Sequence, residues 1–333
     1  VVKWIFKRIN QYEKDTANGE NQNMKLLTTF KLNAEDIKEM EKSGVQVTVF
    51  DTNKDLIQSK EVENADAIIA DHRTLQVDFL ERCKNLKWIH VPHIGIERLP
   101  MQYLKKRNII VTNARGTAGV PISEHIIFTM LMIARKGKYV IKNQNDHQWK
   151  SPRGVFNLYG KTVGLLGTGD IATETAKRLK AFGMKTLGMN TTGEPVEYFD
   201  EVYTTKNLNE FLSQCDFIVC TLPLTEKTKN LIDKEQFKCM KETAYIINIS
   251  RAAIFNEAVL YDYLKNHKIA GAALDVLMEE FRLGYLPEES PFWELDNVII
   301  TPHMAGGGDL WNYFSSKIIM KNVKCFCENK IDE

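Results

Sequence analysis

Short runs of apolar and β-branched residues alternate along the chain with segments of helical spacing. Residues 34–42 have the apolar spacing of a helix, and Asn33 before them is suited to accept hydrogen bonds from its first N–H groups. The strand patterns around this segment cover residues 25–30, 45–50, 65–70 and 86–91. Strands that alternate with helices in this way predict βαβ units and a mostly parallel sheet.

A second alternation of the same kind fills the later part of the chain. It runs from Lys161 to His303 and follows a long apolar helix predicted over residues 120–134, with Pro121 near its first turn. A last helix is predicted over residues 310–328. We therefore expect the α/β class, with two doubly wound domains and a cleft between them.

The first 23 residues differ from the rest. Basic and apolar residues mix over residues 1–8, and residues 13–23 are polar without a core pattern. A secretory signal peptide has a longer apolar run and a small-residue cleavage site, and neither is found. We expect residues 1–23 to be a poorly ordered leader before a folded unit that begins near Met24.

Composition narrows the class of protein. The 333 residues are 44% hydrophobic and 26% charged, which is ordinary for a globular enzyme. The net charge of +1 favours neither a nucleic acid nor an anionic membrane as partner, and no apolar stretch is long enough to span a bilayer. The six cysteines are scattered without a zinc signature. We expect a cytoplasmic protein with reduced thiols and no metal site.

A glycine-rich turn lies between a strand pattern and a helix pattern in the second alternation. In TVGLLGTGDIA, residues 162–172, Gly167 permits a tight turn and Gly169 lets the backbone approach a pyrophosphate. The helix predicted over residues 173–182 then offers free N–H donors and the positive end of its dipole to the phosphates. The pattern predicts a dinucleotide site. Its domain covers residues 113–305 and is inserted into an outer domain of residues 24–112 and 306–333.

The choice between NAD and NADP depends on the end of the next strand pattern, residues 185–189. An NAD site usually has an acidic residue there to bind the ribose 2′-hydroxyl, but this chain has Asn190, followed by Thr191 and Thr192. The missing carboxylate removes the repulsion of a 2′-phosphate, although no arginine follows to attract one. We favour NADP, and NAD stays open.

Three residues after the glycine turn have the chemistry that hydride transfer to or from a 2-hydroxy acid needs. Arg251 is a cation that can hold a carboxylate and polarise a carbonyl, and His303 is an imidazole that can move a proton. Glu280 is a carboxylate that can favour the protonated imidazole.

These residues lie within motifs that resemble the D-isomer-specific 2-hydroxyacid dehydrogenase family. The resemblance covers nearly everything from Met24 on. Its motifs are VTNARGTAGVPISEH (111–125), TVGLLGTGDIA (162–172), FIVCTLPLTEKTKNLI (217–232), IINISRAAI (246–254), AGAALDV (270–276) and NVIITPHMAG (297–306). It implies two Rossmann-like domains around a cleft and a homodimer formed through the nucleotide domain.

The resemblance also implies the roles of individual residues. Arg251 matches the arginine that binds the substrate carboxylate and keto oxygen, His303 the general acid and base, and Glu280 the carboxylate that orients it. Ile94 and Gly95 match a loop whose N–H groups contact the substrate carboxylate. The implied cofactor contacts are Gly167, Thr168, Gly169, Asp170, Ile171, Asn190, Thr191, Thr192, Leu222, Pro223, Thr228, Ile249 and, toward the nicotinamide, Asp275.

The chain departs from the family pattern at three positions. His93 stands where a small residue is common, Ala252 where a glycine usually follows the arginine, and Phe281 where a proline usually follows the glutamate. None removes a catalytic group, but each can reshape the substrate pocket.

The sequence thus predicts an NAD(P)-dependent 2-hydroxyacid dehydrogenase that reduces small 2-keto acids, similar to glyoxylate or hydroxypyruvate reductases. A phosphoglycerate dehydrogenase is a weaker interpretation, since we expect no additional regulatory domain after His303. Formate dehydrogenase is disfavoured because Glu280 is present where that branch uses another partner. The alternative is a dinucleotide-sensing regulatory protein on the same fold, like the C-terminal-binding corepressors.

Overall fold

The alternating patterns form two parallel sheets in the computed structural model, which describes residues 24–328. The leader predicted over residues 1–23 lies outside the described residues. Of the described residues, one unit contains 24–117 and 309–328, and the other contains Ala118–Gly308. The predicted α/β class with two doubly wound parallel sheets is confirmed.

The first unit contains a five-stranded sheet in the order β2-β1-β3-β4-β5, with every neighbouring pair parallel. Its elements are β1 (Met24–Thr28), α3 (Ala34–Lys42), β2 (Val45–Val49), α4 (Asn53–Gln58), η1 (Glu61–Asn64), β3 (Ala67–Ile69), α5 (Val77–Arg82), β4 (Trp88–Val91), α6 (Met101–Lys106), β5 (Ile110–Asn113) and α14 (Trp311–Cys327). Helix α3 has the predicted bounds, and Asn33 Oδ1 accepts the N–H of Asp36 at 2.8 Å. Strand β1 ends two residues earlier than predicted because Thr28 Oγ1 accepts the N–H of Phe30 at 2.9 Å.

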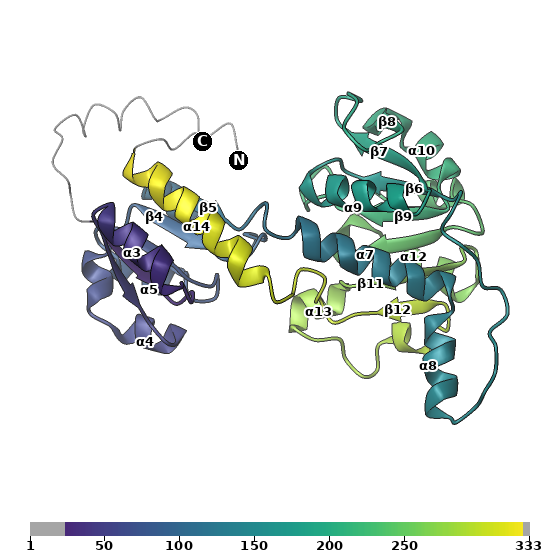
Figure 1. Ribbon diagram of the computed structural model, residues 1–333, viewed down its shortest axis with the longest axis horizontal. Coiled ribbons are helices and arrows are strands. Elements are labelled where there is room, and N and C mark those ends of the chain that lie inside the picture. The colour runs from purple at the N-terminus through teal and green to yellow at the C-terminus, as the bar shows by residue number, and fades with distance from the viewer. Residues whose placement is uncertain (1–23, 329–333) are drawn as a thin grey trace. The chain divides into compact units, whose positions relative to one another are not determined.

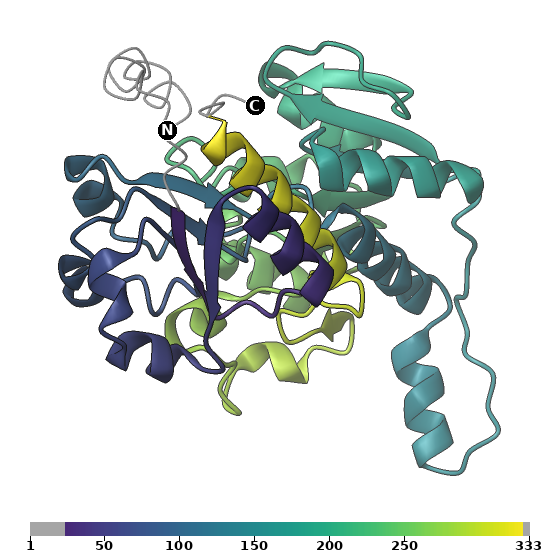
Figure 2. The same ribbon diagram turned by 60° about the vertical axis from the view of Figure 1, so that its left-hand side comes forward.

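Helix α14 completes this unit although nearly two hundred residues separate it from β5. Figures 1 and 2 both show it beside α3. Met40 of α3, Trp88 of β4, and Ile319 and Val323 of α14 are buried in one hydrophobic cluster. The apolar face of α14 therefore supplies a layer that the N-terminal segment does not provide.

The second unit contains a seven-stranded sheet in the order β12-β11-β10-β9-β6-β7-β8, again entirely parallel. Its strands are β6 (Thr162–Leu166), β7 (Lys185–Asn190), β8 (Glu201–Thr204), β9 (Phe217–Cys220), β10 (Tyr245–Asn248), β11 (Gly271–Leu274) and β12 (Val298–Ile300). Its helices are α7 (Gly119–Ala134), α8 (Gly137–Asn145), α9 (Asp170–Ala181), η2 (Thr205–Asn207), α10 (Leu208–Gln214), α11 (Lys234–Lys238), η3 (Ala252–Ile254), α12 (Glu257–Lys265), α13 (Met278–Leu283) and η4 (Pro291–Glu294).

Helices cover both faces of this sheet. Successive side chains of a strand point to opposite faces, so each face offers apolar side chains to a layer of helices. Ile246 belongs to a cluster with residues of α10, α11 and α12, whereas Ile247 belongs to a cluster with residues of α7 and α9. Burial on both faces explains why these strands read as continuous apolar runs in the sequence.

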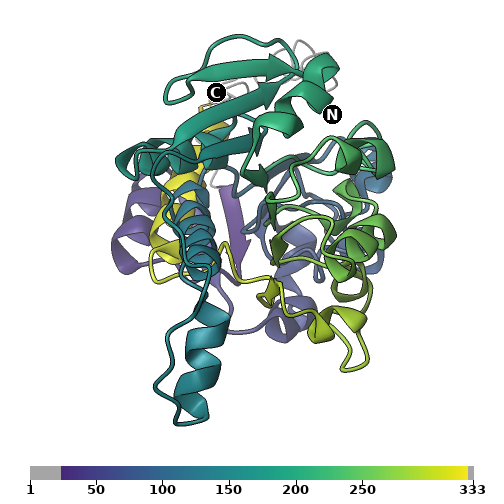
Figure 3. The ribbon, with the colours of Figure 1, turned by 90° about the vertical axis from the view of Figure 1, so that its right-hand side faces the viewer.

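Two features of this unit were not apparent from the hydrophobic pattern. Helix α8 and the segment after it extend away from the rest of the unit (Figure 3). Its apolar residues Tyr139, Val140 and Ile141 are exposed, so they form no core stripe. Helix α9 begins at Asp170, three residues before the predicted start, because Gly169 caps it in an extended conformation.

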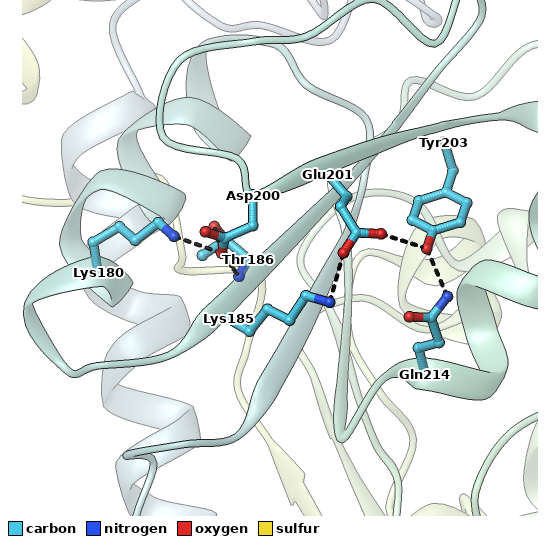
Figure 4. A network of polar contacts seen from close by, with 7 residues as sticks. All are labelled: Lys180, Lys185, Thr186, Asp200, Glu201, Tyr203 and Gln214. Carbon is cyan, nitrogen blue, oxygen red and sulfur yellow. Dashed lines mark hydrogen bonds and ion pairs between the residues drawn. The ribbon is translucent and has the colours of Figure 1, made fainter.

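A polar network joins the N-terminal ends of strands β7 and β8 (Figure 4). The Asp200 carboxylate accepts the N–H of Thr186 at 2.7 Å and an N–H of Lys180 at 2.5 Å. Burial acts to raise the pKa of Asp200, but the hydrogen bonds from Lys180 and Thr186 together lower it by more. The pKa of Asp200 therefore lies below its usual value. Lys185 bonds Glu201 at 2.6 Å in the same way. These bonds hold the edge strand β8 in register with β7.

Candidate active site

Most of the predicted site residues follow strands of the seven-stranded sheet. Because all its strands are parallel, their carboxyl ends meet at one edge of the sheet. Gly167 follows β6, Arg251 lies three residues after β10, Asp275 follows β11 directly, and His303 lies three residues after β12. The chain runs outward through β7 and β8 and returns at β9, so the topological switch point lies between β6 and β9, where ligands of such sheets bind.

The glycine turn occupies that switch point. Gly167 has φ +105°, and a Cβ atom there would lie 2.8 Å from Thr221 Oγ1, so another residue would be strained. A Cβ atom at Gly169, by contrast, meets no protein atom within 4 Å. Helix α9 starts at the next residue, and the N–H groups of its first turn, including those of Asp170 and Ile171, have no partner inside the helix. An open backbone and a helix N-terminus together fit a pyrophosphate.

The side chain of Asn190 organises the loop after β7. Its Oδ1 accepts the N–H groups of Thr192 at 3.1 Å and Gly193 at 2.6 Å. Its Nδ2 donates to Thr168 Oγ1 at 3.2 Å and to the carbonyl of Glu194 at 3.3 Å. Asn190 thus links this loop to the glycine turn, and the exposed hydroxyl-bearing residues Thr191 and Thr192 are presented beside it.

The loop after β9 is closed by its own hydroxyl groups. Thr228 Oγ1 donates to the carbonyl of Pro223 at 2.7 Å and accepts the N–H of Thr225 at 2.8 Å. Leu222 accepts a hydrogen bond from Ser250 Oγ, which joins this loop to the one after β10. Ile249 is buried in the core cluster that also contains α7 and α9.

Arg251 lies on a turn shaped by buried Asn248. The Asn248 side chain accepts the N–H of Ser250 at 3.1 Å and donates to the carbonyl of Arg251 at 3.3 Å. The Arg251 guanidinium donates to the carbonyl of Ser250 at 2.8 Å, which uses one of its five N–H groups in this contact. The turn therefore fixes the base of a long cationic side chain at the carboxyl edge of the sheet.

His303 and Glu280 are in direct contact. His303 Nδ1 lies 3.0 Å from Glu280 Oε1, with Glu280 on the short helix α13 and His303 after β12. The His303 side chain is 48% exposed and that of Glu280 is 20% exposed. For His303 Nε2, no hydrogen-bond partner is found in the described part of the chain. One ring nitrogen is thus held by a carboxylate, and the side chain as a whole stays half-exposed.

The turn that carries His303 depends on Asp275. His303 has φ +52°, a left-handed conformation that is unfavourable for a residue with a side chain. The Asp275 carboxylate accepts the N–H groups of Met304 and Ala305, each at 3.0 Å, and the hydroxyl of Thr301 at 2.6 Å. The Asp275 carbonyl accepts the N–H of His303 at 3.1 Å. Since Asp275 is only 3% exposed, its carboxylate is committed to this turn.

A buried histidine extends this network. His125 Nε2 lies 3.2 Å from Thr301 Oγ1 and 3.8 Å from Asp275 Oδ1. Burial lowers the pKa of His125, while the charge of Asp275 acts in the opposite direction. With the Thr301 hydroxyl proton directed to Asp275, His125 is suited to donate to Thr301.

The remaining predicted residues, Ile94 and Gly95, lie in the first unit, in the loop after β4. The carbonyl of His93 accepts the N–H of Ala114 at 3.2 Å, and the carbonyl of Ile94 accepts a side-chain N–H of Asn113 at 2.6 Å. No acceptor for the N–H groups of Ile94 and Gly95 is found among residues 24–328. The loop is thus held through two of its carbonyls.

Sequence reasoning did not single out four residues that shape the site: His125, Asn248, Ser250 and Thr301. All four lie inside motifs that carry the family resemblance, and Thr301 immediately precedes Pro302 and His303. The signal that marks them is a polar residue within an apolar helix or strand, or directly after an apolar strand.

Among residues 24–328, no group of three or more His, Cys, Asp or Glu side chains is arranged to hold a metal ion. No helix in that range has the length and apolar content needed to cross a membrane.

Comparison with known proteins is consistent with this geometry. The family model described as D-isomer specific 2-hydroxyacid dehydrogenase, NAD binding domain, matches residues 127–305, and the corresponding catalytic-domain model matches residues 26–178. The D-3-phosphoglycerate dehydrogenase of Methanocaldococcus jannaschii is 32% identical over 93% of this chain and 59% of its own length. The chain thus spans between half and two thirds of the length of this protein and of the D-3-phosphoglycerate dehydrogenase of Archaeoglobus fulgidus.

Two other similar proteins are matched along most of their length. The hydroxypyruvate reductase of Thermotoga maritima is 32% identical over 80% of this chain and 86% of its own. The crystal structure of D-lactate dehydrogenase from Aquifex aeolicus, complexed with NAD and lactic acid, is 25% identical and covers 92% of this chain and 96% of its own, with a TM-score of 0.73.

Proposed function

The chain belongs to the D-isomer specific 2-hydroxyacid dehydrogenase family, and on that premise we propose that it transfers a hydride between a nicotinamide dinucleotide and a small 2-keto or 2-hydroxy acid. Reduction of the keto acid is the direction we favour. The observation that carries the proposal is the His303–Glu280 contact of 3.0 Å at the same sheet edge as the Arg251 turn and the glycine turn.

Arg251, Glu280 and His303 each have a distinct role in this proposal. Arg251 binds the substrate carboxylate and polarises the keto oxygen, because its planar fork of donors stays charged and can bind two oxygens at once. Glu280 accepts the Nδ1–H of His303, so Nε2 is the nitrogen that gives a proton to the keto oxygen in reduction and takes it back in oxidation. Asp275 holds the turn on which the imidazole is carried.

The glycine turn and the loops beside it are proposed to hold the dinucleotide. The open position at Gly169 and the N-terminus of α9 fit the pyrophosphate, with Thr168, Asp170 and Ile171 around it. Leu222, Pro223 and Thr228 follow β9, and Ile249 follows β10; we propose that they contact the dinucleotide beyond its pyrophosphate. When bound, the nicotinamide supplies or accepts the hydride.

NADP is the cofactor we favour, with NAD also accepted. The loop after β7 offers the amide of Asn190 and the exposed Thr191 and Thr192, none of which is charged. A 2′-phosphate meets no carboxylate from these three residues, and a 2′-hydroxyl can bind the same polar groups.

In the first unit, the N–H groups of Ile94 and Gly95 are proposed to bind the substrate carboxylate. Two adjacent N–H groups without an acceptor among residues 24–328 can both donate to the oxygens of one carboxylate. The carbonyls of His93 and Ile94 already accept hydrogen bonds from Ala114 and Asn113, so the loop is shaped in advance for this contact.

A homodimer formed through the second unit is also proposed. Apolar side chains are exposed along α7, α8 and the segment that follows α8: Phe128, Tyr139, Ile141, Trp149 and Tyr159. A concentration of exposed apolar groups on an extended arm is typical of a protein interface. Sedimentation equilibrium of the purified chain measures the oligomeric state directly.

The test is turnover of NADPH and NADH with glyoxylate, hydroxypyruvate and pyruvate, for the wild type and for Arg251→Ala. We expect wild-type turnover and a loss of at least about 30-fold in kcat/KM for the variant, since removing one partner of a buried charged contact costs roughly 2–5 kcal/mol. Arg282→Ala, an exposed arginine of α13, is the matched control and is expected to keep its activity. Dinucleotide binding without turnover of any of these acids would instead favour a sensing role.

A further inference from the structure

His93 stands directly before the loop proposed to bind the substrate carboxylate, and its ring is held on three sides. Its Nε2 lies 3.0 Å from Asp71 Oδ2. Its ring stacks on Trp311 with a centroid distance of 6.0 Å and an interplanar angle of 25°, and it meets the edge of His72 at 6.1 Å. The side chain is still 44% exposed. A ring so fixed yet so exposed presents one defined edge to a ligand.

The residues that contact this ring are themselves held by other contacts. Asp71 follows β3, and its Oδ1 accepts the N–H of Arg73 at 2.7 Å. Trp311 begins α14 and packs edge-on against Phe30 at 5.3 Å. The position of the His93 ring is therefore determined by the core of the first unit and does not rely on the loop alone.

The Asp71 contact also determines which ring nitrogen carries the proton. The hydrogen bond with His93 is the largest influence on Asp71 and brings its pKa well below the usual value, against the effect of burial. Asp71 is thus ionised at neutral pH and can only accept, so His93 Nε2 must be the donor. Nδ1 accepts a hydrogen bond only in the neutral ring, so the substrate contact proposed below is made by that form. For Nδ1, no partner is found in the described part of the chain.

The reach of this acceptor matches a short substrate. Consecutive Cα atoms are about 3.8 Å apart, so the residue before Ile94 lies within one side-chain length of anything bound to the Ile94 and Gly95 N–H groups. Carbon 3 of a 2-keto acid is two bonds from the carboxylate carbon. A group on carbon 3 is therefore within range of the His93 ring when the carboxylate is bound at the loop.

We propose that His93 is a specificity-determining residue whose Nδ1 accepts a hydrogen bond from a hydroxyl group on carbon 3 of the substrate. The preferred substrates are then 3-hydroxy-2-keto acids, of which hydroxypyruvate is the smallest. This assignment rests on the proposed function of the protein as a keto-acid reductase.

Other substituents fit this site less well. An anionic group on carbon 3, such as a phosphate, would approach the ionised Asp71 carboxylate that lies against the same ring. An apolar group would cover Nδ1 without replacing the hydrogen bond that it makes to water. A hydroxyl group avoids both penalties.

The experiment compares kcat/KM for hydroxypyruvate with that for pyruvate, which lacks only the hydroxyl oxygen, in the wild type and three variants. His93→Asn places an amide near the position of Nδ1 and gives up the Asp71 contact. His93→Gln places its amide near the position of Nε2 and has no hydrogen-bond acceptor at the position of Nδ1. His93→Leu removes both. The ratio for two substrates of one preparation does not depend on the fraction of folded enzyme, so a destabilised variant still gives a result.

We expect the wild type to prefer hydroxypyruvate and His93→Asn to keep most of that preference. In His93→Gln and His93→Leu the ratio should fall by roughly 5- to 10-fold, the range for loss of one neutral hydrogen bond. An unchanged ratio of kcat/KM for hydroxypyruvate to that for pyruvate in His93→Leu would overturn the assignment. So would a ratio that is kept in His93→Gln and lost in His93→Asn. Either result would leave His93 only a structural role in holding Asp71. If the wild type reduces none of glyoxylate, hydroxypyruvate and pyruvate, the proposed function itself is overturned, and this assignment with it.

Discussion

Asp275→Asn tests whether the His303 turn is held by one carboxylate. Asp275 accepts three hydrogen bonds, from the hydroxyl of Thr301 and the N–H groups of Met304 and Ala305. Asparagine has nearly the same shape but only one accepting oxygen. In either orientation of its amide, at least one N–H of the turn faces an NH₂ group and loses its acceptor.

The size of the effect follows from this geometry. A buried donor left without an acceptor costs about 1–3 kcal/mol, and a charge-assisted hydrogen bond is replaced by a neutral one. The left-handed conformation of His303 itself costs about 1–2 kcal/mol, so the lost bonds are comparable to the strain that they offset. We expect the free energy of unfolding to fall by about 1–3 kcal/mol. We also expect the turn to relax and kcat for keto-acid reduction to fall at least about 10-fold.

Three measurements on one variant separate the possible roles of Asp275: urea unfolding, dinucleotide affinity by fluorescence titration, and kcat. Asp262→Asn is the matched control, since Asp262 is an exposed carboxylate that pairs with Lys268 at 2.8 Å. Its loss should change the free energy of unfolding by less than about 0.5 kcal/mol. If Asp275→Asn keeps its stability and its kcat but loses dinucleotide affinity, the carboxylate serves the cofactor directly and our account of the turn is wrong.

Three further outcomes are expected. Glu280→Gln should lower kcat for reduction roughly 10- to 100-fold with little change in dinucleotide affinity, because the amide no longer offers a charged partner to His303; wild-type kcat would show that the 3.0 Å contact is not used. Asn190→Asp should lower kcat/KM for NADPH relative to NADH by at least about 10-fold, because a carboxylate repels a 2′-phosphate and the Nδ2 donation to Thr168 is lost; an unchanged ratio would place the ribose elsewhere. Burial lowers the pKa of His90 from 6.5 to about 4, so the unfolded chain binds the proton first and the free energy of unfolding should fall by up to about 3 kcal/mol as the pH drops through that interval. His90→Gln should flatten that pH dependence, and the same slope in urea unfolding of wild type and variant would refute it.

The sequence contained enough information for the class of fold because both faces of the sheets are buried. Continuous apolar strands such as 245–248, separated by amphipathic helices, leave few alternatives to a parallel sheet. Element ends were less predictable, since they depend on local polar contacts such as that of Thr28 with Phe30. Helix α8 has no core-facing stripe that a periodic pattern could reveal.

The site divides in a similar way. Arg251, Glu280 and His303 were recognised by their motifs, but the contact between Glu280 and His303 joins residues 23 positions apart on different elements. The partners of Asp275 and the pairing of His93 with Asp71 depend on how neighbouring strands end, which is a property of the folded sheet. Motifs identify which residues matter, whereas tertiary structure determines which atom of each remains available.

The central claim is that a hydride passes between the nicotinamide ring and carbon 2 of a keto acid. Incubation with NADPH or NADH deuterated at carbon 4 of the nicotinamide, on each face in turn, tests it directly with hydroxypyruvate or glyoxylate as acceptor. We expect the product to carry deuterium at carbon 2 from one face only, and product formed from hydroxypyruvate to be the D isomer. Oxidation of the cofactor without deuterium in the product, or no oxidation with any small 2-keto acid, would contradict the account.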